Sequence, residues 1–465
     1  MSDIVRRKFL GKRSTKGCRT CRARHVKCDE APGACRNCPA TGRTCDGYDE
    51  HRLPVRKGWS ARGTMVGYGG QMTPDERRGL SYFQNSVIPS LFGFFDCPMW
   101  RRFLLQISQT EPAVWHSINM LSAIYYDAKE NGMRVSGDDL SNAQHTYALE
   151  QATRAFSLLT RRSASSDPEL RQVVLLCCFL FVLSELLLGR YDNAFVHLRS
   201  GTQLAREFMR QKGLQSPVVR SLLDWFIFLN VQSSHLVGIG RDDEPEVAPG
   251  IPTFPATFRN VQETRYTARH IINSTCMFLA RCWRLSDSEK MTEYEELWAK
   301  RQSFLATFDR FERQFESLSQ ASYHGMSRQD QRSMEIVRLQ YQSQYLALEG
   351  CLCAPQDLAA LTPKHAAFVS TCERLMGLFP DRPAVTLDIG FIPGLHMVAT
   401  QCVDFSVRVR AIEALCAWPH CEGILKSNLA VELAVQALEA DMQRQGEACF
   451  PEPLKDRFQA IVMPW

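Results

Sequence analysis

The sequence has no long uninterrupted apolar run and no recognisable secretion signal near its start. Its most apolar stretch, residues 173–188, is interrupted by Ser184 and Glu185. That stretch is too short and too polar to cross a bilayer, so we expect a buried core helix. Residues 1–17 contain no apolar segment of the kind a secretory signal needs. We therefore expect no membrane partner, and cysteines that serve as metal ligands or core residues rather than in disulfides.

The sequence also lacks the short motifs of common enzyme active sites. It contains no G-x-S-x-G and no H-E-x-x-H. A phosphate-binding loop is missing too, because Gly11-Lys12 is followed by Arg13 and the glycine needed five residues earlier is Arg6. Alternating apolar and polar runs, which are typical of strands, are nearly absent. We predict an all-α protein that is not an enzyme.

Charge is unevenly distributed along the 465 residues. Residues 1–60 hold 15 Lys and Arg against 6 Asp and Glu, whereas the remaining 405 hold 40 against 44. The first part therefore has a balance of +9 and the rest a balance of −4. A short basic head on a large, slightly acidic body is typical of a protein whose head binds a polyanion. The length is sufficient for two or three domains with a large core.

Six of the 18 cysteines lie within 28 residues of one another. Their spacing, C-x2-C-x6-C-x6-C-x2-C-x6-C, contains C-x2-C-x6-C twice at an offset of 17 residues. Two metal ions with closed tetrahedral sulfur shells need eight sulfur bonds, which six thiolates provide if two of them bridge. Thiolates without a histidine partner favour zinc. The candidate ligands are Cys18, Cys21, Cys28, Cys35, Cys38 and Cys45.

Three other interpretations account for these cysteines less well. An iron–sulfur cluster normally uses four cysteines and does not explain the repeat. A disulfide framework is typical of small secreted domains, and the chain shows no secretory signs. Six unrelated core cysteines would not produce a repeated spacing.

Residues 17–49 resemble the binuclear zinc cluster of fungal Zn2Cys6 transcription factors, because all six cysteines fall on the spacing of that family. The resemblance implies two Zn²⁺ ions and a location in the nucleus. It also implies that the first and fourth cysteines bridge the ions. In the family the cluster replaces a hydrophobic core, which about 10–16 kcal/mol of zinc-binding free energy makes feasible. The implied ligands are Cys18, Cys21, Cys28 and Cys35 for one ion, and Cys18, Cys35, Cys38 and Cys45 for the other.

The resemblance implies that the basic stretch at residues 22–27 is a short helix that enters the major groove of DNA and reads a CGG-like triplet. An arginine can donate two hydrogen bonds to guanine, which contributes about 1–3 kcal/mol of discrimination. Arg24 is the predicted base reader. His25 stands where the family usually has a second Arg or Lys, and it offers one donor but little charge. The predicted phosphate contacts are Lys16, Arg19, Arg22, Lys27, Arg36 and Arg43.

Composition and motifs divide the chain into four segments. The basic run Arg6-Arg7-Lys8 makes the first of them a candidate nuclear import signal or DNA arm. The third is rich in glycine and has no apolar period, which is typical of a flexible linker. The segments are a basic arm (1–16), a Zn2Cys6 DNA-binding domain (17–46), a linker (47–72) and an all-helical regulatory domain (73–465).

The fourth segment shows apolar periodicity along its length. Thr73, Pro74 and Glu76 have the pattern of a capped helix start. Gly189 is predicted to end the most apolar helix and Asp192 to cap the next, which would form a tight helical hairpin. The predicted helices span residues 100–130, 143–162, 169–188, 192–210, 216–238, 261–284, 290–320, 331–352, 364–378, 395–417 and 429–444.

Parts of this segment resemble the fungal-specific second transcription factor domain, an all-helical regulatory domain whose ligand is generally unknown. The similarity spans roughly residues 80–445. The matching stretches include Leu80–Phe83, Gly93–Asp96, Glu111–Val114, Asn193–Gly201, Leu387–Pro393 and Arg408–Leu415.

Four further sequence patterns can each be interpreted in two ways. Phe304, Phe308, Phe311 and Phe315 could form a dimer seam, but a core face is the better prediction. The proline-rich, acidic residues 241–258 are predicted to be a solvated loop rather than an activation segment. Neither Cys351-x-Cys353 nor Cys416-x3-His420-Cys421 has a complete ligand set, so both are predicted to be core or surface thiols.

The leading hypothesis is a sequence-specific, DNA-binding regulator of RNA polymerase II genes, with a metabolic gene set as the expected target. Its partners would be double-stranded DNA and the transcription machinery or co-regulators. A homodimer stays open, because residues 46–80 show no heptads. The alternative is a nuclear scaffold or corepressor whose zinc cluster has lost DNA reading, and His25 is its support.

Overall fold

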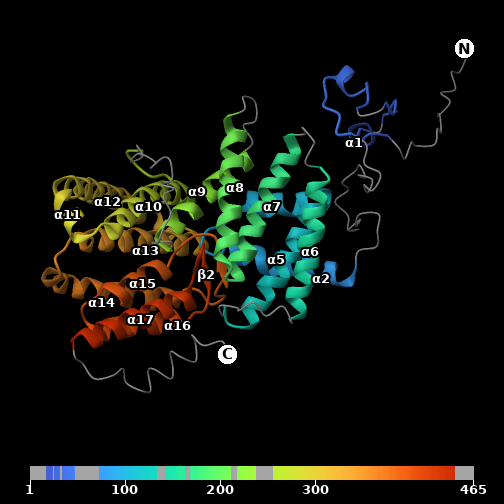
Figure 1. Ribbon diagram of the computed structural model, residues 1–465. Helices are drawn as coiled ribbons and strands as arrows, with labels where there is room; N and C mark the ends of the chain where they lie inside the picture. The colour runs from blue at the N-terminus through green and yellow to red at the C-terminus, as the bar shows by residue number, and fades with distance from the viewer. Residues whose placement is uncertain are drawn as a thin grey trace, which may run out of the picture.

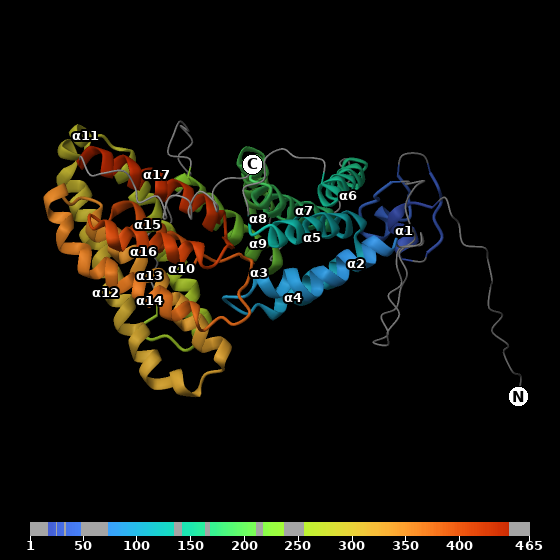
Figure 2. The same cartoon turned by 90° about the horizontal axis from the view of Figure 1, so that it is seen from below.

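The computed structural model describes residues 17–24, 26–31, 34–47, 73–133, 142–162, 168–210, 217–236 and 255–445. The basic arm (1–16), residues 48–72 of the predicted linker and residues 241–254 of the predicted acidic loop lie outside this part of the chain. Figures 1 and 2 both show a small head around α1 (Arg19–Ala23) beside one end of a helical body. Helices α2 and α6 lie nearest the head, and α11 lies at the opposite end.

The body is a succession of helices, as the apolar periodicity predicts. Neighbours in the chain pack in pairs, such as α5 with α6 and α7 with α8. The elements are α2 (Pro74–Tyr82), a π-helical turn η2 (Phe83–Val87), α3 (Ile88–Leu91), α4 (Pro98–Thr110), α5 (Pro112–Glu130), α6 (Ala143–Thr160), α7 (Pro168–Leu187), α8 (Tyr191–Arg210), α9 (Pro217–Leu236), α10 (Val261–Arg284), α11 (Asp287–Thr292), α12 (Tyr294–Ser322), η3 (Tyr323–Gly325), α13 (Arg328–Gly350), η4 (Pro355–Leu361), α14 (Thr362–Met376), α15 (Ile392–Gln401), α16 (Phe405–Cys416) and α17 (Ser427–Gln445).

Side-chain caps explain six of the helix starts in the part of the chain described. The predicted start at Thr73 is confirmed, because its side chain accepts from the Glu76 N–H at 3.2 Å and the Glu76 carboxylate accepts in return. Three long predicted helices are each two helices instead. The breaks fall before Pro112, at Glu293 and before Asp404, which caps α16. Asp192 lies in the first turn of α8 rather than capping it.

One continuous hydrophobic core runs through the body from Leu80 to Leu438. The phenylalanine stripe of α12 belongs to it, which confirms the prediction of a core face; Phe311 and Phe315, for example, pack against Tyr341 of α13. Helix α7 alone, in the part of the chain described, is long and apolar enough to cross a membrane. Its Leu170–Leu187 window is 72% buried inside the protein, as predicted for a core helix.

Three two-residue strands form a small sheet that the sequence pattern does not reveal: β1 (Val385–Thr386), β2 (Cys421–Glu422) and β3 (Leu425–Lys426). β1 pairs with β2 in parallel, and β2 with β3 antiparallel. Two residues are too few to show a strand alternation. The sheet joins distant segments: Ser90 of α3 bonds both backbone groups of Val385, and Gln232 of α9 accepts from the Ile424 N–H.

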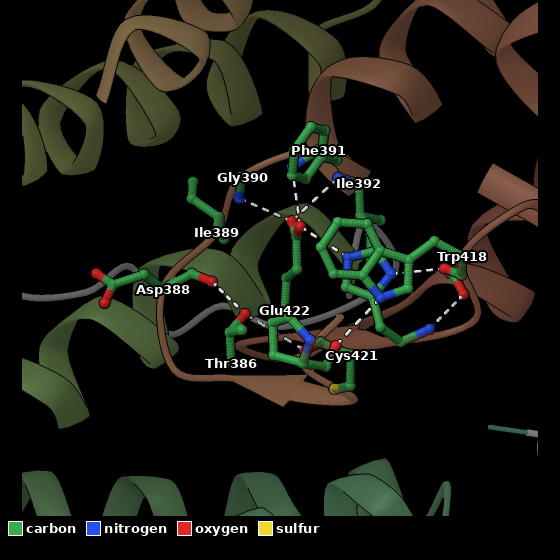
Figure 3. Close-up of polar contacts among 12 residues, drawn as sticks. Thr386, Asp388, Ile389, Gly390, Phe391, Ile392, Trp418, Cys421 and Glu422 are labelled. Carbon is green, nitrogen blue, oxygen red and sulfur yellow. Dashed lines mark hydrogen bonds and ion pairs between the residues drawn. The ribbon is translucent and has the colours of Figure 1, made fainter. Parts of the chain in front are cut away.

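Glu422 is the polar centre of this sheet and is fully buried. Its carboxylate accepts hydrogen bonds from three successive backbone N–H groups at the start of α15, those of Gly390 at 2.7 Å, Phe391 at 2.8 Å and Ile392 at 3.0 Å (Figure 3). These N–H groups have no partner within their own helix, and the positive end of the helix dipole favours an anion there. Glu422 thus fixes where α15 begins.

His420 completes the contacts of that carboxylate. Its Nε2 lies 2.9 Å from Oε1 of Glu422, and its Nδ1 lies 2.6 Å from the carbonyl oxygen of Trp418. Because a carbonyl oxygen only accepts, Nδ1 carries a proton. The indole of Trp418 stacks on the imidazole at 4.4 Å. Both ring nitrogens therefore have partners inside the body, and His420 is a structural residue.

Lys426 is a second buried charge of the sheet, and only 1% of it is exposed. Its Nζ donates to the carbonyl oxygen of Leu187 at the end of α7, at 2.5 Å. Burial lowers the pKa of Lys426 to about 8. The charged form is therefore less favourable in the folded chain than in the unfolded one.

We expect Lys426 to make the stability of the protein depend on pH. Its folded pKa lies below its unfolded value of about 10.4, so the unfolded chain binds more protons and stability rises with pH. From pH 7 to pH 9, the free energy of unfolding should rise by about 1 kcal/mol more in the wild type than in Lys426→Met. Urea unfolding at both pH values measures this. The exposed Lys300 gives the control, Lys300→Met, and parallel profiles for wild type and Lys426→Met would refute the expectation.

Candidate metal centre and nucleic-acid interface

The six head cysteines lie together in the structure. Cys18 and Cys35 are central, with their sulfurs 3.5 Å apart. Within each of two groups of four cysteines, all sulfurs lie within 4.8 Å of one another, and both groups contain this central pair. In the part of the chain described, no other three His, Cys, Asp or Glu residues meet this criterion. The two groups are Cys18, Cys21, Cys28 and Cys35, and Cys18, Cys35, Cys38 and Cys45.

The sulfur separations fit tetrahedral zinc. Zinc–sulfur bonds of about 2.3 Å at tetrahedral angles place sulfurs about 3.8 Å apart. The sulfur of Cys35 lies 3.5 Å from that of Cys21 and 3.3 Å from that of Cys38, and the Cys18–Cys38 distance is 3.7 Å. Thiolates are also the ligands that structural zinc prefers. Small outward movements of the sulfurs would place them on a metal ion.

The two halves of the head repeat the same backbone arrangement. The Cys18 N–H donates to the sulfur of Cys28 and the Cys35 N–H donates to the sulfur of Cys45, both at 3.2 Å. Such N–H donors stabilise the thiolate form that binds a metal. The first C-x2-C begins at Cys18, just before α1, and ends at Cys21 within it, whereas the second precedes the 3-10 turn η1 (Pro39–Thr41), which ends at Gly42 with φ +69°. The internal repeat in the sequence is thus a repeat in structure.

The head has almost no apolar core of its own. Among its described residues, the buried hydrophobic side chains are all cysteines. Burial raises the pKa of Cys18, and it raises that of Cys21 to about 12. Burial acts in the same direction on Cys35, but hydrogen bonds with Cys38, Cys18 and Cys21 outweigh it and lower the pKa to about 6. Without metal the thiols of Cys18 and Cys21 therefore hold protons, which zinc must displace.

The helix predicted to read DNA lies earlier in the chain than predicted. Helix α1 spans Arg19–Ala23, so it contains only the first two residues of the basic stretch 22–27. The chain turns after Ala23, where the Val26 N–H donates to the carbonyl oxygen of Cys21 at 3.1 Å. This turn is needed because Cys28 must return to Cys18.

The predicted DNA contacts have different surroundings. Arg24 is half-buried and donates from Nη1 to Thr41 Oγ1 at 2.7 Å, which ties the two halves of the head together. Three others, Lys27, Arg36 and Arg43, are exposed. Lys16, His25 and the side chain of Arg22 lie outside the described residues.

Arg19, a predicted phosphate contact, is buried in the structure. Only 5% of it is exposed, and its guanidinium lies 3.8 Å from Asp46 and 3.7 Å from Glu111 of the body. Glu111 also pairs with Arg162 at 2.6 Å. Two carboxylates therefore hold Arg19 between head and body, an arrangement that spacing within the head alone does not reveal.

Several supporting residues of the head were missed by the sequence analysis. Asp29 accepts from the Arg36 N–H at 2.9 Å, and Asn37 donates to the carbonyl oxygen of Lys27 at 2.8 Å. Thr20 bonds the carbonyl oxygen of Thr44 at 3.2 Å. The available signal was position, because Asp29, Asn37 and Thr20 each stand next to a cysteine of the cluster, and small polar residues beside metal ligands often brace them.

Comparisons with known proteins agree with this geometry. The fungal Zn(2)-Cys(6) binuclear cluster domain matches residues 16–54, and the fungal specific transcription factor domain matches residues 78–331, more than half of the chain. The aspercryptin biosynthesis cluster-specific transcription regulator of Emericella nidulans is 22% identical over 93% of this chain and 88% of its own length. A transcription regulator of Purpureocillium lilacinum is 27% identical over 40% of this chain and 48% of its own.

Similarity to other regulators is confined to shorter segments. The transcriptional regulatory protein moc3 of Schizosaccharomyces pombe is 58% identical over 8% of this chain and 8% of its own length. No solved structure matches the chain. The matched families and relatives are transcription regulators rather than enzymes. A zinc-binding cysteine cluster and a helical body with these two matches identify the chain as a member of the fungal transcription regulators that combine a Zn(2)-Cys(6) cluster with the fungal specific transcription factor domain.

Proposed function

We propose that this chain regulates transcription in the nucleus by reading a CGG-like triplet through a head that holds two zinc ions. The observation that carries the proposal is the pair of four-sulfur groups that share Cys18 and Cys35. With both ions bound, these two sulfurs would be shared and each ion would have four sulfur ligands, which would leave no open position for catalysis. Zinc therefore serves to hold the head in shape for DNA.

The basic residues divide into a reader and a set of phosphate contacts. Arg24 lies just past α1, and its guanidinium would exchange Thr41 for a guanine edge when the head reads DNA. We assign Lys16, Arg22, Lys27, Arg36 and Arg43 to phosphates, with His25 beside the reader. Arg19 is left out, because its carboxylate partners already hold it. Five phosphate contacts predict a slope of about −4 to −5 for log affinity against log salt.

The experiment that tests the function is selection of a random duplex library by the zinc-loaded full chain, followed by sequencing. We expect a CGG-like triplet to be enriched with zinc and not after chelation. One triplet, or two at a fixed spacing, would distinguish a single head from a pair of heads on DNA. A zinc-loaded chain that enriches no sequence would overturn the proposal in favour of a scaffold or corepressor.

Replacing the reader should change specificity, not only affinity. We expect Arg24→Ala to lose about 1–3 kcal/mol of discrimination at one guanine, because the bidentate contact is lost. Arg36→Ala should instead weaken binding to all sequences about equally and make the salt slope less steep by about 1. Competition binding with single-base variants of the selected site measures both.

Thr41→Val is the matched control for Arg24→Ala. It removes the hydroxyl that Arg24 contacts while keeping the arginine and a side chain of similar shape. Thr41→Val should discriminate between guanine and the other bases at that position as well as the wild type does. If Thr41→Val and Arg24→Ala behave alike, Arg24 serves to join the halves of the head and does not read a base.

The helical body is proposed to regulate the head and to bind co-regulators or a second copy of the chain. The relative that spans most of this chain is named for one biosynthesis cluster. We therefore propose a metabolic gene set as the target. Expression profiling of a deletion strain tests this, and changes scattered over unrelated genes would count against it.

A further inference from the structure

Two open hollows of about 470 and 450 Å³ adjoin on the surface of the body, and Arg259, Ala321 and Ser322 line both of them. They therefore form one trough, which runs along the C-terminal half of α12 and past η3 to the start of α13. Its other wall is the segment just before α10, where Phe258 packs against Phe311 of α12 with ring centres 5.3 Å apart. In Figures 1 and 2, α12 lies on the side of the body away from the head, so the trough is a feature of the body alone.

The shape of the trough suits an extended chain better than a compact molecule. Its lining on α12 runs from Arg310 to Ser322, a length of about 18 Å at the rise of an α-helix. Five or six extended residues span about the same length. Pockets for small molecules are usually lined by apolar and aromatic side chains. Here Phe258, Val261 and Leu318 are buried in the core, so the trough presents mainly polar groups, and a peptide is the kind of ligand that it fits.

One end of the trough is rich in positive charge. Arg259, Arg310 and Arg313 line it, and the last two lie three residues apart on α12, where side chains are neighbours. Arg259 pairs with Glu263 at 2.7 Å. Among the described residues that line the two hollows, the one carboxylate is that of Asp330, at the opposite end beyond η3. The arginine end therefore favours an anionic ligand.

The nearby acids of α12 do not neutralise this end of the trough. Glu316 pairs with Arg338 of α13, and Glu312 accepts a hydrogen bond from the Tyr341 hydroxyl at 3.2 Å. Both carboxylates therefore have partners on α13. Arg313 is exposed and has no ion-pair partner among the residues that the structure describes. Its guanidinium can therefore bind a carboxylate of another molecule.

We propose that this trough binds an acidic segment of a partner protein as an extended peptide. Carboxylates of the peptide pair with Arg313 and its neighbours Arg259 and Arg310, since a guanidinium can donate two parallel hydrogen bonds to one carboxylate. The hydroxyls of Thr257 and Ser317 in the same lining are available to the peptide backbone. The inference rests on the co-regulator binding proposed for the body and gives the chemistry of that partner, and it does not depend on DNA reading by the head.

Hydrogen exchange of the zinc-loaded full chain tests the proposal, with hexaglutamate as the probe. Because exchange is measured segment by segment, binding of this anion to the basic head is distinguished from binding to the trough. We expect hexaglutamate to slow amide exchange in residues 256–262 and 317–326, and hexalysine to leave both segments unchanged. The DNA selection reads the head instead, so the two proposals can fail separately.

Three outcomes of this experiment would overturn the proposal. Protection confined to the head would show that the trough does not bind an acidic peptide. Equal protection of the trough by inorganic phosphate would indicate a simple anion site. Protection that needs no probe and grows with the concentration of the chain would assign the trough to a second copy of the protein.

Charge reversal on α12 gives the matched comparison. Arg313→Glu should raise the hexaglutamate concentration that half-protects residues 256–262 by about tenfold, because an attraction becomes a repulsion. Lys300→Glu makes the same change of charge on the same helix outside the trough, and it should raise that concentration by less than about twofold. Both side chains are exposed, so both variants should fold. Equal effects of the two variants would show that only the net charge of the chain matters, which would refute a site at Arg313.

Discussion

Chelation of zinc is expected to unfold the head and to leave the helices of the body in place. The body has a continuous core from Leu80 to Leu438, whereas the buried hydrophobic side chains of the described head are all cysteines. Zinc binding of about 10–16 kcal/mol is then the main source of folding free energy for the head. Chelation should remove the protection of head amides from hydrogen exchange, with little change in helical circular dichroism.

Single cysteine variants should separate bridging from terminal ligands. Cys35 belongs to both four-sulfur groups and Cys45 to one. We expect Cys35→Ser to lose both ions, and Cys45→Ser to keep about one per chain. Metal analysis of purified protein measures the ratio. Cys416→Ser, which changes a half-buried thiol of the body, is the control and should keep about two. Equal losses in Cys35→Ser and Cys45→Ser would contradict shared bridging.

Acid should release the zinc as well. Burial raises the pKa of Cys18, and of Cys21 to about 12, so protons compete strongly for these sulfurs once the metal leaves. Zinc affinity should therefore fall as pH decreases. A titration with a competing chromophoric chelator at pH 8 and pH 6 measures this, and equal affinities at the two pH values would contradict proton competition.

The metal site could be predicted from the sequence because its ligands lie close together in the chain. Short spacings restrict which sulfurs can meet, and the repeat at 17 residues corresponds to equivalent hydrogen bonds in the two halves of the head. Most helices could also be predicted, because an apolar face repeats within each one. The predicted helix at residues 261–284 has the same bounds as α10. Such features depend on neighbours along the chain.

What could not be predicted depends on contacts between distant residues. Arg19 has the appearance of a DNA contact in the sequence, but Glu111 of the body is one of its partners. The strands are too short for any pattern, and Glu422 binds backbone groups thirty or more residues earlier in the chain. The stretch Leu387–Pro393 was recognised by resemblance alone. Its structural role is clear only once Gly390 and Asp388 are seen beside Glu422 and Arg265.

The largest effect in the body is expected at Glu422. Replacing it with alanine would leave the N–H groups of Gly390, Phe391 and Ile392 without a partner, and would leave His420 without its carboxylate. Leaving these three buried N–H groups without an acceptor costs about 3 kcal/mol or more in total, at about 1–3 kcal/mol each. We expect Glu422→Ala to lower the free energy of unfolding by that amount. Urea unfolding of the full chain, followed by circular dichroism, measures it.

Two comparisons separate this polar role of Glu422 from simple loss of volume. Glu295→Ala, at an exposed position of α12, should change stability by less than about 0.5 kcal/mol. The double variant His420→Ala/Glu422→Ala should cost less than the two single variants together, because His420 has no anion to bind once Glu422 is gone. Additive effects would show that the two side chains act independently. A coupled pair would show that the contact between His420 and Glu422 is part of what Glu422 contributes to stability.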